Sequence, residues 1–196
     1  MNGTEKQQCT AFEGSRALAS GELVQVAGQV KEMIERGEAH SVLIFDDLTS
    51  ELIEVDFRGT MEDVLGRLEK PEATQEPAFH RGPGRPKLGV VPREVTLLPR
   101  HWEWLNAQPG GASVALRKLV EEARRVNSER DRLRSSQTAL YRFMSAMAGD
   151  LPGFEEASRA LFAGEPEKFS DRIAAWPVDI QSHLQKLSAN AFQLQA

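Results

Sequence analysis

The chain has 196 residues, 40% of them hydrophobic and 27% charged, which is typical of a soluble globular protein with one domain or two small ones. It has no apolar run long enough to span a membrane and no signal-peptide character at its start, and its single cysteine, Cys9, excludes an intramolecular disulfide. We therefore expect a cytoplasmic protein, and its formal net charge of −5 argues against a uniformly basic nucleic-acid binder.

The first 70 residues predict a small α+β domain in which the elements follow in the order ββαββα. A helix is expected between the second and third strands, with Ser20 as its N-cap and Gly37 at its end. Thr60 is the expected N-cap of a second, shorter helix. Four segments have the composition of strands, the third continuously apolar and the fourth alternating: residues 9–12, 16–19, 41–45 and 52–57.

Two adjacent carboxylates, Asp46 and Asp47, follow the third predicted strand. Paired carboxylates in such a place can bind Mg²⁺. The sequence has no phosphate-binding loop and no third acidic ligand to complete such a site, whereas aspartate is common in turns. We therefore interpret both as turn residues. The histidines also lack metal-ligand spacing, so we expect no metal, no cofactor and no catalytic site, and the protein is predicted not to be an enzyme.

Residues 71–90 read as a linker whose second half is basic. Its segment RGPGRPK, residues 81–87, contains a Gly-Arg-Pro core and resembles an AT-hook peptide. Glycine allows close approach to DNA, and proline holds the chain extended. The resemblance implies a minor-groove arm whose DNA-binding residues are Arg81, Gly84, Arg85, Pro86 and Lys87.

Residues 91–126 have the layout of a strand followed by two short helices. The β-branched and apolar residues from Val91 to Leu98 favour a strand, and Pro99 suits the first position of a helix. Pro109-Gly110-Gly111 would end that helix, and Ser113 is a suitable N-cap for the next.

This order resembles the ribbon-helix-helix DNA-binding proteins, which form an intertwined dimer whose paired strands enter the major groove. The resemblance implies a homodimer on duplex DNA, with Ser113 at the phosphate-binding start of the second helix. Arg93 and Thr96 are the candidate base contacts, but they fall on opposite faces of the strand, which favours readout of DNA shape. The alternative is an ordinary strand and helix pair inside a larger core.

Residues 127–196 predict a C-terminal helical region. Its first helix, over 127–148, carries Leu133, Leu140 and Met147 at seven-residue spacing, which is typical of a packing seam. Shorter helices follow, with Phe169 and Trp176 as expected core residues. The predicted fold class is therefore α+β: an N-terminal domain (1–70), a linker with a basic arm (71–90), a ribbon-helix-helix-like segment (91–126) and a helical region (127–196).

Basic charge is concentrated in the middle of the chain. The net charge is −9 for residues 1–78, +6 for 79–134 and −2 for 135–196. A basic segment on an otherwise acidic protein is what a nucleic-acid-binding face requires. It fits equally a protein-interaction module whose basic segment binds an acidic protein surface, so both functions stay open. A small-molecule sensor or an enzyme is the less favoured reading.

Across nearly its whole length the chain is similar to an uncharacterised bacterial family, the domain of unknown function 2239. The similarity is carried by TAFEGSRALASGEL near the N-terminus, by LIFDD, and by the run GRPKLGVVPREVTLLPRHWEWLNAQPGGASVALRKLVEEARR. It implies a fold family and no particular chemistry.

Overall fold

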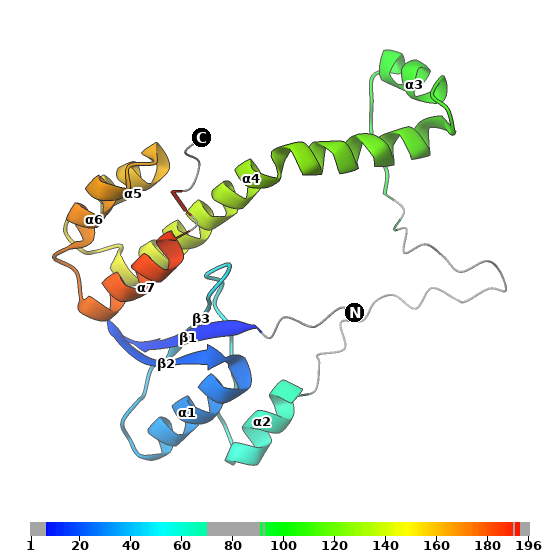
Figure 1. The fold of residues 1–196 in the computed structure, drawn as a ribbon. Helices are drawn as coiled ribbons and strands as arrows, with labels where there is room; N and C mark the ends of the chain where they lie inside the picture. The colour runs from blue at the N-terminus through cyan, green and yellow to red at the C-terminus, as the bar shows by residue number, and fades with distance from the viewer. Residues whose placement is uncertain (1–6, 70–90, 92, 190, 193–196) are drawn as a thin grey trace. The chain divides into compact units, whose positions relative to one another are not determined.

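The computed structural model describes residues 7–69, 91, 93–189 and 191–192 (Figure 1). The chain divides into two compact units: unit 1 contains residues 1–71 and 129–196, and unit 2 contains residues 72–128. The N-terminal and C-terminal regions, which the sequence presented as separate segments, therefore belong to one unit. The predicted α+β class is confirmed, with one three-stranded antiparallel sheet and seven helices among the described residues.

The sheet of unit 1 has the strand order β2-β1-β3, from β1 (Gln8–Glu13), β2 (Arg16–Glu22) and β3 (Leu43–Asp46). The prediction of a fourth strand over 52–57 was wrong. Of these residues only Leu52 forms a β-bridge, an isolated one to Phe45. Alternate side chains of this segment still pack against the apolar core beside the sheet. The alternation of apolar and polar residues that suggested a strand therefore arises because one side of the segment is buried. It does not indicate a ladder of backbone hydrogen bonds.

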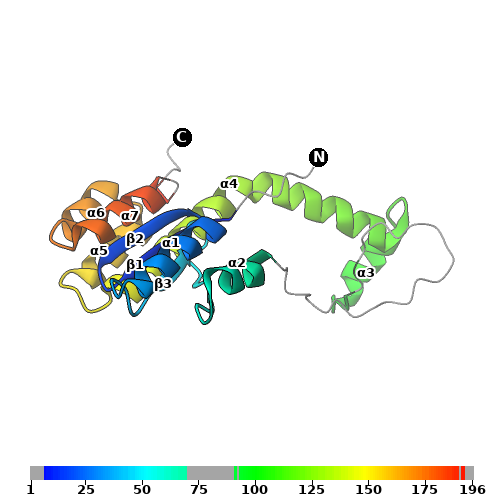
Figure 2. The same cartoon turned by 90° about the horizontal axis from the view of Figure 1, so that it is seen from below.

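The helices α1 (Leu23–Glu35) and α2 (Met61–Glu69) lie side by side (Figures 1 and 2). Ser20 does not cap α1: β2 continues through it, and its hydroxyl lies 3.0 Å from that of Thr10 on β1. Gly37 ends the helix as predicted, since its positive φ of 72° lets its amide turn back to the Ile34 carbonyl. Thr60 also caps α2 as predicted, because the Asp63 amide donates to its hydroxyl.

Both faces of the sheet are covered. Val26 and Val30 of α1 pack with Cys9, Ala11 and Ile44 on one face. The other face carries Phe12 and Phe45, which pack against the C-terminal part of α4 (Gly111–Ala148) and against the helices that follow it (Figure 1). Those helices are α5 (Phe154–Ala163), α6 (Pro166–Ile173) and α7 (Val178–Ser188). Phe169 and Trp176 lie in this second core, as predicted.

The turn after β3 is built by Asp46, as the sequence indicated. Its carboxylate accepts hydrogen bonds from the amides of Leu48 (2.9 Å) and Thr49 (2.7 Å). These bonds and that from the Gln7 side chain outweigh the effect of partial burial and lower the Asp46 pKa. The carboxylate is therefore occupied by its own turn.

Unit 2 contains α3 (Pro99–Asn106) and the first part of α4. Pro99 occupies the first turn of α3 as predicted. The predicted strand is not seen: residues 91 and 93–98 have no strand geometry and pair with no other described residue. The helix expected after the Ser113 cap and the helix expected over 127–148 are one continuous helix, α4, because no glycine or proline interrupts the sequence between them.

Candidate interface in residues 91–128

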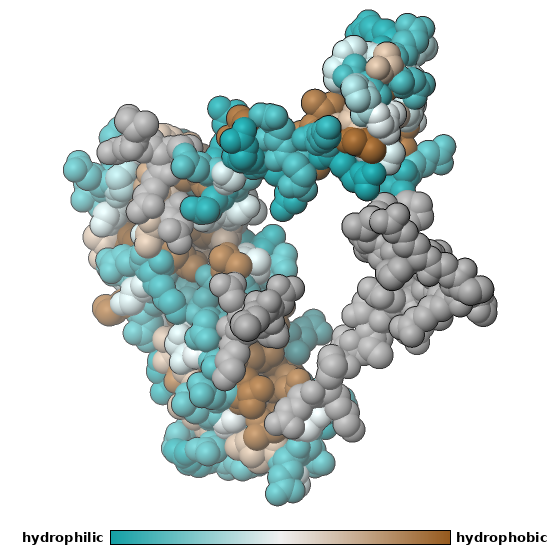
Figure 3. Space-filling view, turned by 45° about the vertical axis from the view of Figure 1, so that its right-hand side comes forward, coloured by the Kyte–Doolittle hydropathy of each residue, from teal (hydrophilic) through white to brown (hydrophobic). Residues whose placement is uncertain are grey.

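The described residues of unit 2 have very little core of their own. Only Leu105 and Ala115 are buried there, with 3% and 7% of their surfaces exposed. Eight large apolar side chains of the same unit are exposed: Val91, Val95, Leu98, Trp102, Trp104, Leu119, Val120 and Val126. Figure 3 shows apolar surface next to hydrophilic surface on these helices. Exposed apolar side chains that gather on one segment are typical of interaction sites, which makes this segment the candidate interface.

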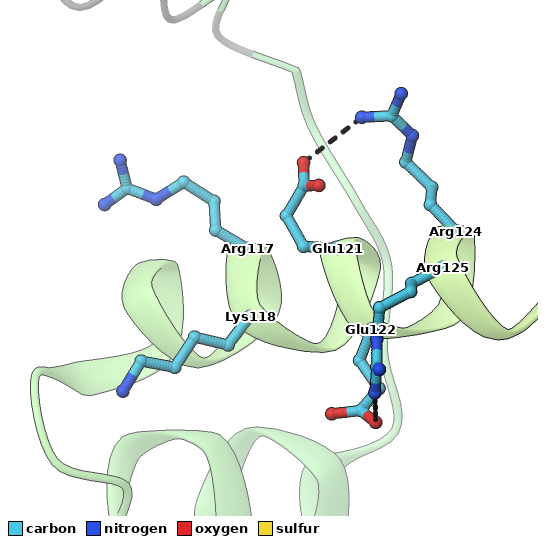
Figure 4. Close-up of a pocket in the computed structure, with 6 residues that line it drawn as sticks. All are labelled: Arg117, Lys118, Glu121, Glu122, Arg124 and Arg125. Atoms are coloured by element: carbon cyan, nitrogen blue, oxygen red, sulfur yellow. Dashed lines mark hydrogen bonds and ion pairs between the residues drawn. The ribbon is translucent and has the colours of Figure 1, made fainter.

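The start of α4 carries six charged side chains that line an open hollow of about 880 Å³ (Figure 4). Glu121 pairs with Arg124 and Glu122 with Arg125, each at 3.2 Å. All four side chains are well exposed, so solvent screens the pairs and they add little stability. The two pairs nevertheless neutralise half of the basic charge in the hollow.

The other two cations, Arg117 and Lys118, form no ion pair with any described residue. Arg117 donates from Nε to the Ser113 carbonyl oxygen at 3.1 Å, which leaves the rest of its guanidinium group in solvent. Figure 4 shows the two side chains extending on different sides of α4, away from both ion pairs. They can therefore bind an anion without first breaking an internal pair.

The structure places only some of the predicted DNA-binding residues. Arg93 and Thr96 are exposed, but neither lies in a strand. Ser113 is exposed inside the first turn of α4, so its predicted role as the N-cap was wrong: the helix already begins at Gly111. No hydrogen bond or ion pair joins these three among the described residues. The arm residues Arg81, Gly84, Arg85, Pro86 and Lys87 lie outside the described part of the chain.

A second polar cluster, in unit 1, was missed by sequence reasoning. Asp47 accepts a hydrogen bond from Thr10 (2.7 Å) and forms an ion pair with Lys186 of α7 (2.7 Å). His183, one turn earlier on α7, is buried against Phe12 and Phe143, and its Nε2 has no hydrogen-bond partner among the described residues. The cluster joins residues more than 130 positions apart, so no local sequence signal could have revealed it.

The chemistry of this cluster is structural. Burial lowers the pKa of His183 to about 4, because a charged imidazolium loses its hydration there. Burial, together with Asp47 and Asp46, raises the pKa of the Cys9 thiol to about 11, so it stays protonated and a poor nucleophile. Asp47 is already held by Thr10 and Lys186. The imidazole is therefore neutral, the thiol is protonated and the carboxylate already has partners. We interpret the cluster as the contact by which α7 docks on the sheet.

No set of three or more histidine, cysteine or acidic side chains in the described ranges is placed to hold a metal ion. Within the same ranges, every helix is too short or too polar to cross a membrane.

Comparison with curated proteins and with solved structures finds no significant match. A family model described as an uncharacterized protein conserved in bacteria (DUF2239) matches residues 8–188. This match spans both units and includes every helix and strand described above. The chain belongs to this bacterial family.

Proposed function

We propose that the protein binds duplex DNA as a dimer, through the basic arm at residues 81–87 and the segment 91–128. The observation that carries the proposal is that cations without a carboxylate partner and apolar side chains without a covering partner gather in the same segment of an otherwise acidic chain. A dimeric DNA-binding protein needs both kinds of surface: one that contacts the phosphates and one that contacts the second copy.

The apolar surface supports association with another polypeptide. Residues 93–98 follow neither helix nor strand geometry within one chain, although their composition is that of a strand. A single β-strand has no stability of its own, because its backbone groups pair only with a neighbouring strand. Pairing with the same residues of a second copy gives each strand its partner and covers Val95 and Leu98.

The charged surface supports binding to a polyanion. Four cations of unit 2 have no carboxylate partner among the described residues: Arg93, Arg100, Arg117 and Lys118. Two carboxylates, Glu94 and Glu103, are likewise unpaired, so the excess of positive charge in the described segment is small. The arm adds Arg81, Arg85 and Lys87 directly before it. Together these residues account for several phosphate contacts.

The test is binding of the full chain to labelled mixed-sequence duplex DNA by fluorescence anisotropy over a series of salt concentrations. Each phosphate neutralised contributes about −0.9 to the slope of log K against log salt. We expect a slope worth several contacts, flattened by roughly one contact in Arg85→Ala and by up to two in the double variant Arg117→Ala/Lys118→Ala.

The matched control is Arg159→Ala. Arg159 is an exposed arginine on α5, outside the proposed interface, and its removal should leave the slope unchanged. Absence of binding at low salt, or equal weakening by the control, overturns the proposal.

The second candidate is a protein-interaction module. It is favoured by the two internal ion pairs of α4, which reduce the positive charge offered to DNA, and by the number of exposed apolar side chains. It predicts no DNA affinity in the same salt series.

A further inference from the structure

A second hollow lies within unit 1, between α4 and the turn that follows β3. Its volume is about 590 Å³, which is in the range of pockets that hold small molecules. Thr49 and Glu51 of the turn form part of one wall. The other wall is one side of α4 and includes Arg132, Ser135 and Arg142.

The wall formed by the turn is fixed by bonds within the protein. The Asp46 carboxylate accepts hydrogen bonds from the amides of Leu48 and Thr49 and from the Thr49 hydroxyl at 3.1 Å. Arg142 of α4 donates from Nη1 to the Thr49 carbonyl oxygen, and the same atom lies 3.2 Å from Oε1 of Glu51. A ligand does not have to order this wall, which lowers the entropic cost of binding.

The lining of the hollow carries three arginines against one glutamate. Glu51 is paired with Arg142. Arg134 has only a 3.8 Å contact with Asp131, and its side chain is 72% exposed, so solvent screens that contact. Arg132 forms no ion pair with any residue that the structure describes. The guanidinium groups of Arg132 and Arg134 can therefore bind an anion without breaking a close ion pair.

Hydroxyl groups lie along the same stretch of α4. Ser135 and Ser136 line the hollow, and neither hydroxyl has a hydrogen-bond partner within the described ranges. Thr138 differs, because its hydroxyl already donates to the Arg134 carbonyl oxygen at 2.8 Å. Guanidinium groups and hydroxyls together are donors that suit phosphate oxygens, whereas an apolar ligand would leave them unpaired.

We propose that this hollow binds the phosphate groups of a small phosphorylated molecule. Arg132 and Arg134 are the cationic contacts, and Ser135 and Ser136 are the hydroxyl donors. The hollow is larger than one phosphate group requires, so a diphosphate or triphosphate group is the better match. The Glu51 carboxylate opposes such a ligand, because it lies in the same hollow. The inference goes beyond the proposed function, since it concerns unit 1 and does not require DNA.

The test is isothermal titration calorimetry of the full chain with inorganic tripolyphosphate at low ionic strength. We expect saturable binding to a single site. Arg132→Gln/Arg134→Gln should weaken it by about tenfold or more, because two charge-assisted contacts are lost. Both side chains are exposed, so far-ultraviolet circular dichroism should be unchanged.

The matched control is Arg159→Gln/Arg172→Gln, which removes two exposed arginines from α5 and α6 and makes the same change in net charge. Its affinity for tripolyphosphate should equal that of the wild type. Absence of binding by the wild type, or equal weakening by the two double variants, overturns the proposal.

A substitution of opposite sign tests the same hollow. Glu51→Gln should tighten tripolyphosphate binding several-fold, because it removes the carboxylate and frees the Arg142 guanidinium, which Thr49 still holds. Glu167→Gln, at an exposed position of α6, changes the net charge equally and should leave the affinity unchanged. Unchanged or weaker binding by Glu51→Gln overturns the proposal, because it shows that the anion binds elsewhere.

Duplex DNA carries the same phosphate groups, so the DNA salt series is repeated with Arg132→Gln/Arg134→Gln. A slope equal to that of the wild type is expected for a site that takes a small molecule. A flattened slope, without tripolyphosphate binding by the wild type, assigns the two arginines to DNA and overturns this inference alone. Saturable tripolyphosphate binding by a chain that binds no DNA retains the inference and overturns the proposed function.

Discussion

The two units differ in what holds them together. In unit 1, aromatic and aliphatic side chains from both ends of the sequence fill a common core: Phe12 and Phe45 from the sheet meet Phe143 of α4. In unit 2, only Leu105 and Ala115 are buried among the described residues, while apolar side chains face solvent. Unit 1 is therefore held together by internal packing, whereas the described part of unit 2 leaves most of its large apolar side chains exposed.

The largest difference in stability between substitutions in the two units is expected at Phe143. Its side chain is fully buried and touches the rings of Phe12, Phe45 and His183. Phe143→Ala should lower the free energy of unfolding by about 3–5 kcal/mol, through lost burial and the cavity left behind. Trp104→Ala in unit 2 should change it by less than about 1 kcal/mol, because that ring is half exposed. Urea denaturation measures both changes, and equal losses would show that the two side chains contribute equally to the stability of the fold.

The second effect is a pH dependence confined to unit 1. The pKa of His183 is about 4 in the folded chain, below its ordinary value of 6.5, so the unfolded chain binds the proton more readily. The contribution of His183 to stability is complete above pH 6.5 and is lost as the pH falls towards 4. Between pH 7.5 and pH 5 the loss should be about 2 kcal/mol.

Urea denaturation of the wild type and of His183→Leu at both pH values isolates this residue from the neighbouring Asp47 and Lys186. We expect the wild type to lose about 2 kcal/mol more than the variant on acidification. Equal losses in the two proteins would show that His183 does not titrate in this way.

The smallest effect compares ion pairs in the two units. Asp47 is nearly buried, and Lys186→Met leaves its carboxylate with Thr10 as its remaining partner. This substitution should lower the free energy of unfolding by about 1–3 kcal/mol. Arg124→Ala breaks an exposed pair in unit 2 and should cost less than about 0.5 kcal/mol. The two variants can be compared by thermal or urea unfolding at the same ionic strength. A larger cost for Arg124→Ala would reverse the comparison.

Much of the local structure could be predicted from the sequence, because short-range chemistry decides it. Gly37 ends α1 through its positive φ, Thr60 caps α2 through its hydroxyl, and Pro99 begins α3 because its missing amide has no partner to lose. Asp46 forms the predicted turn through its own carboxylate. These features depend on residues within three or four positions of one another.

The candidate interface was only partly predictable. Its basic charge and its apolar residues are visible in the sequence, but their exposure is not, since the same pattern describes a buried pair of elements. Ser113 was misplaced because the helix begins two residues earlier, at Gly111. The strand predicted over 91–98 failed for a different reason: a strand requires a partner, and the described part of the chain supplies none there.

The sequence by itself determined the α+β class, the ends of several helices and the concentration of basic charge in residues 79–134. Only the tertiary structure decided that both ends of the chain share one core, that α7 docks on the sheet through His183 and Lys186, and that residues 52–57 pack without forming a strand. The physical reason is one of range. Caps, turns and periodicity act over a few residues, whereas burial depends on which distant segment arrives to cover a face.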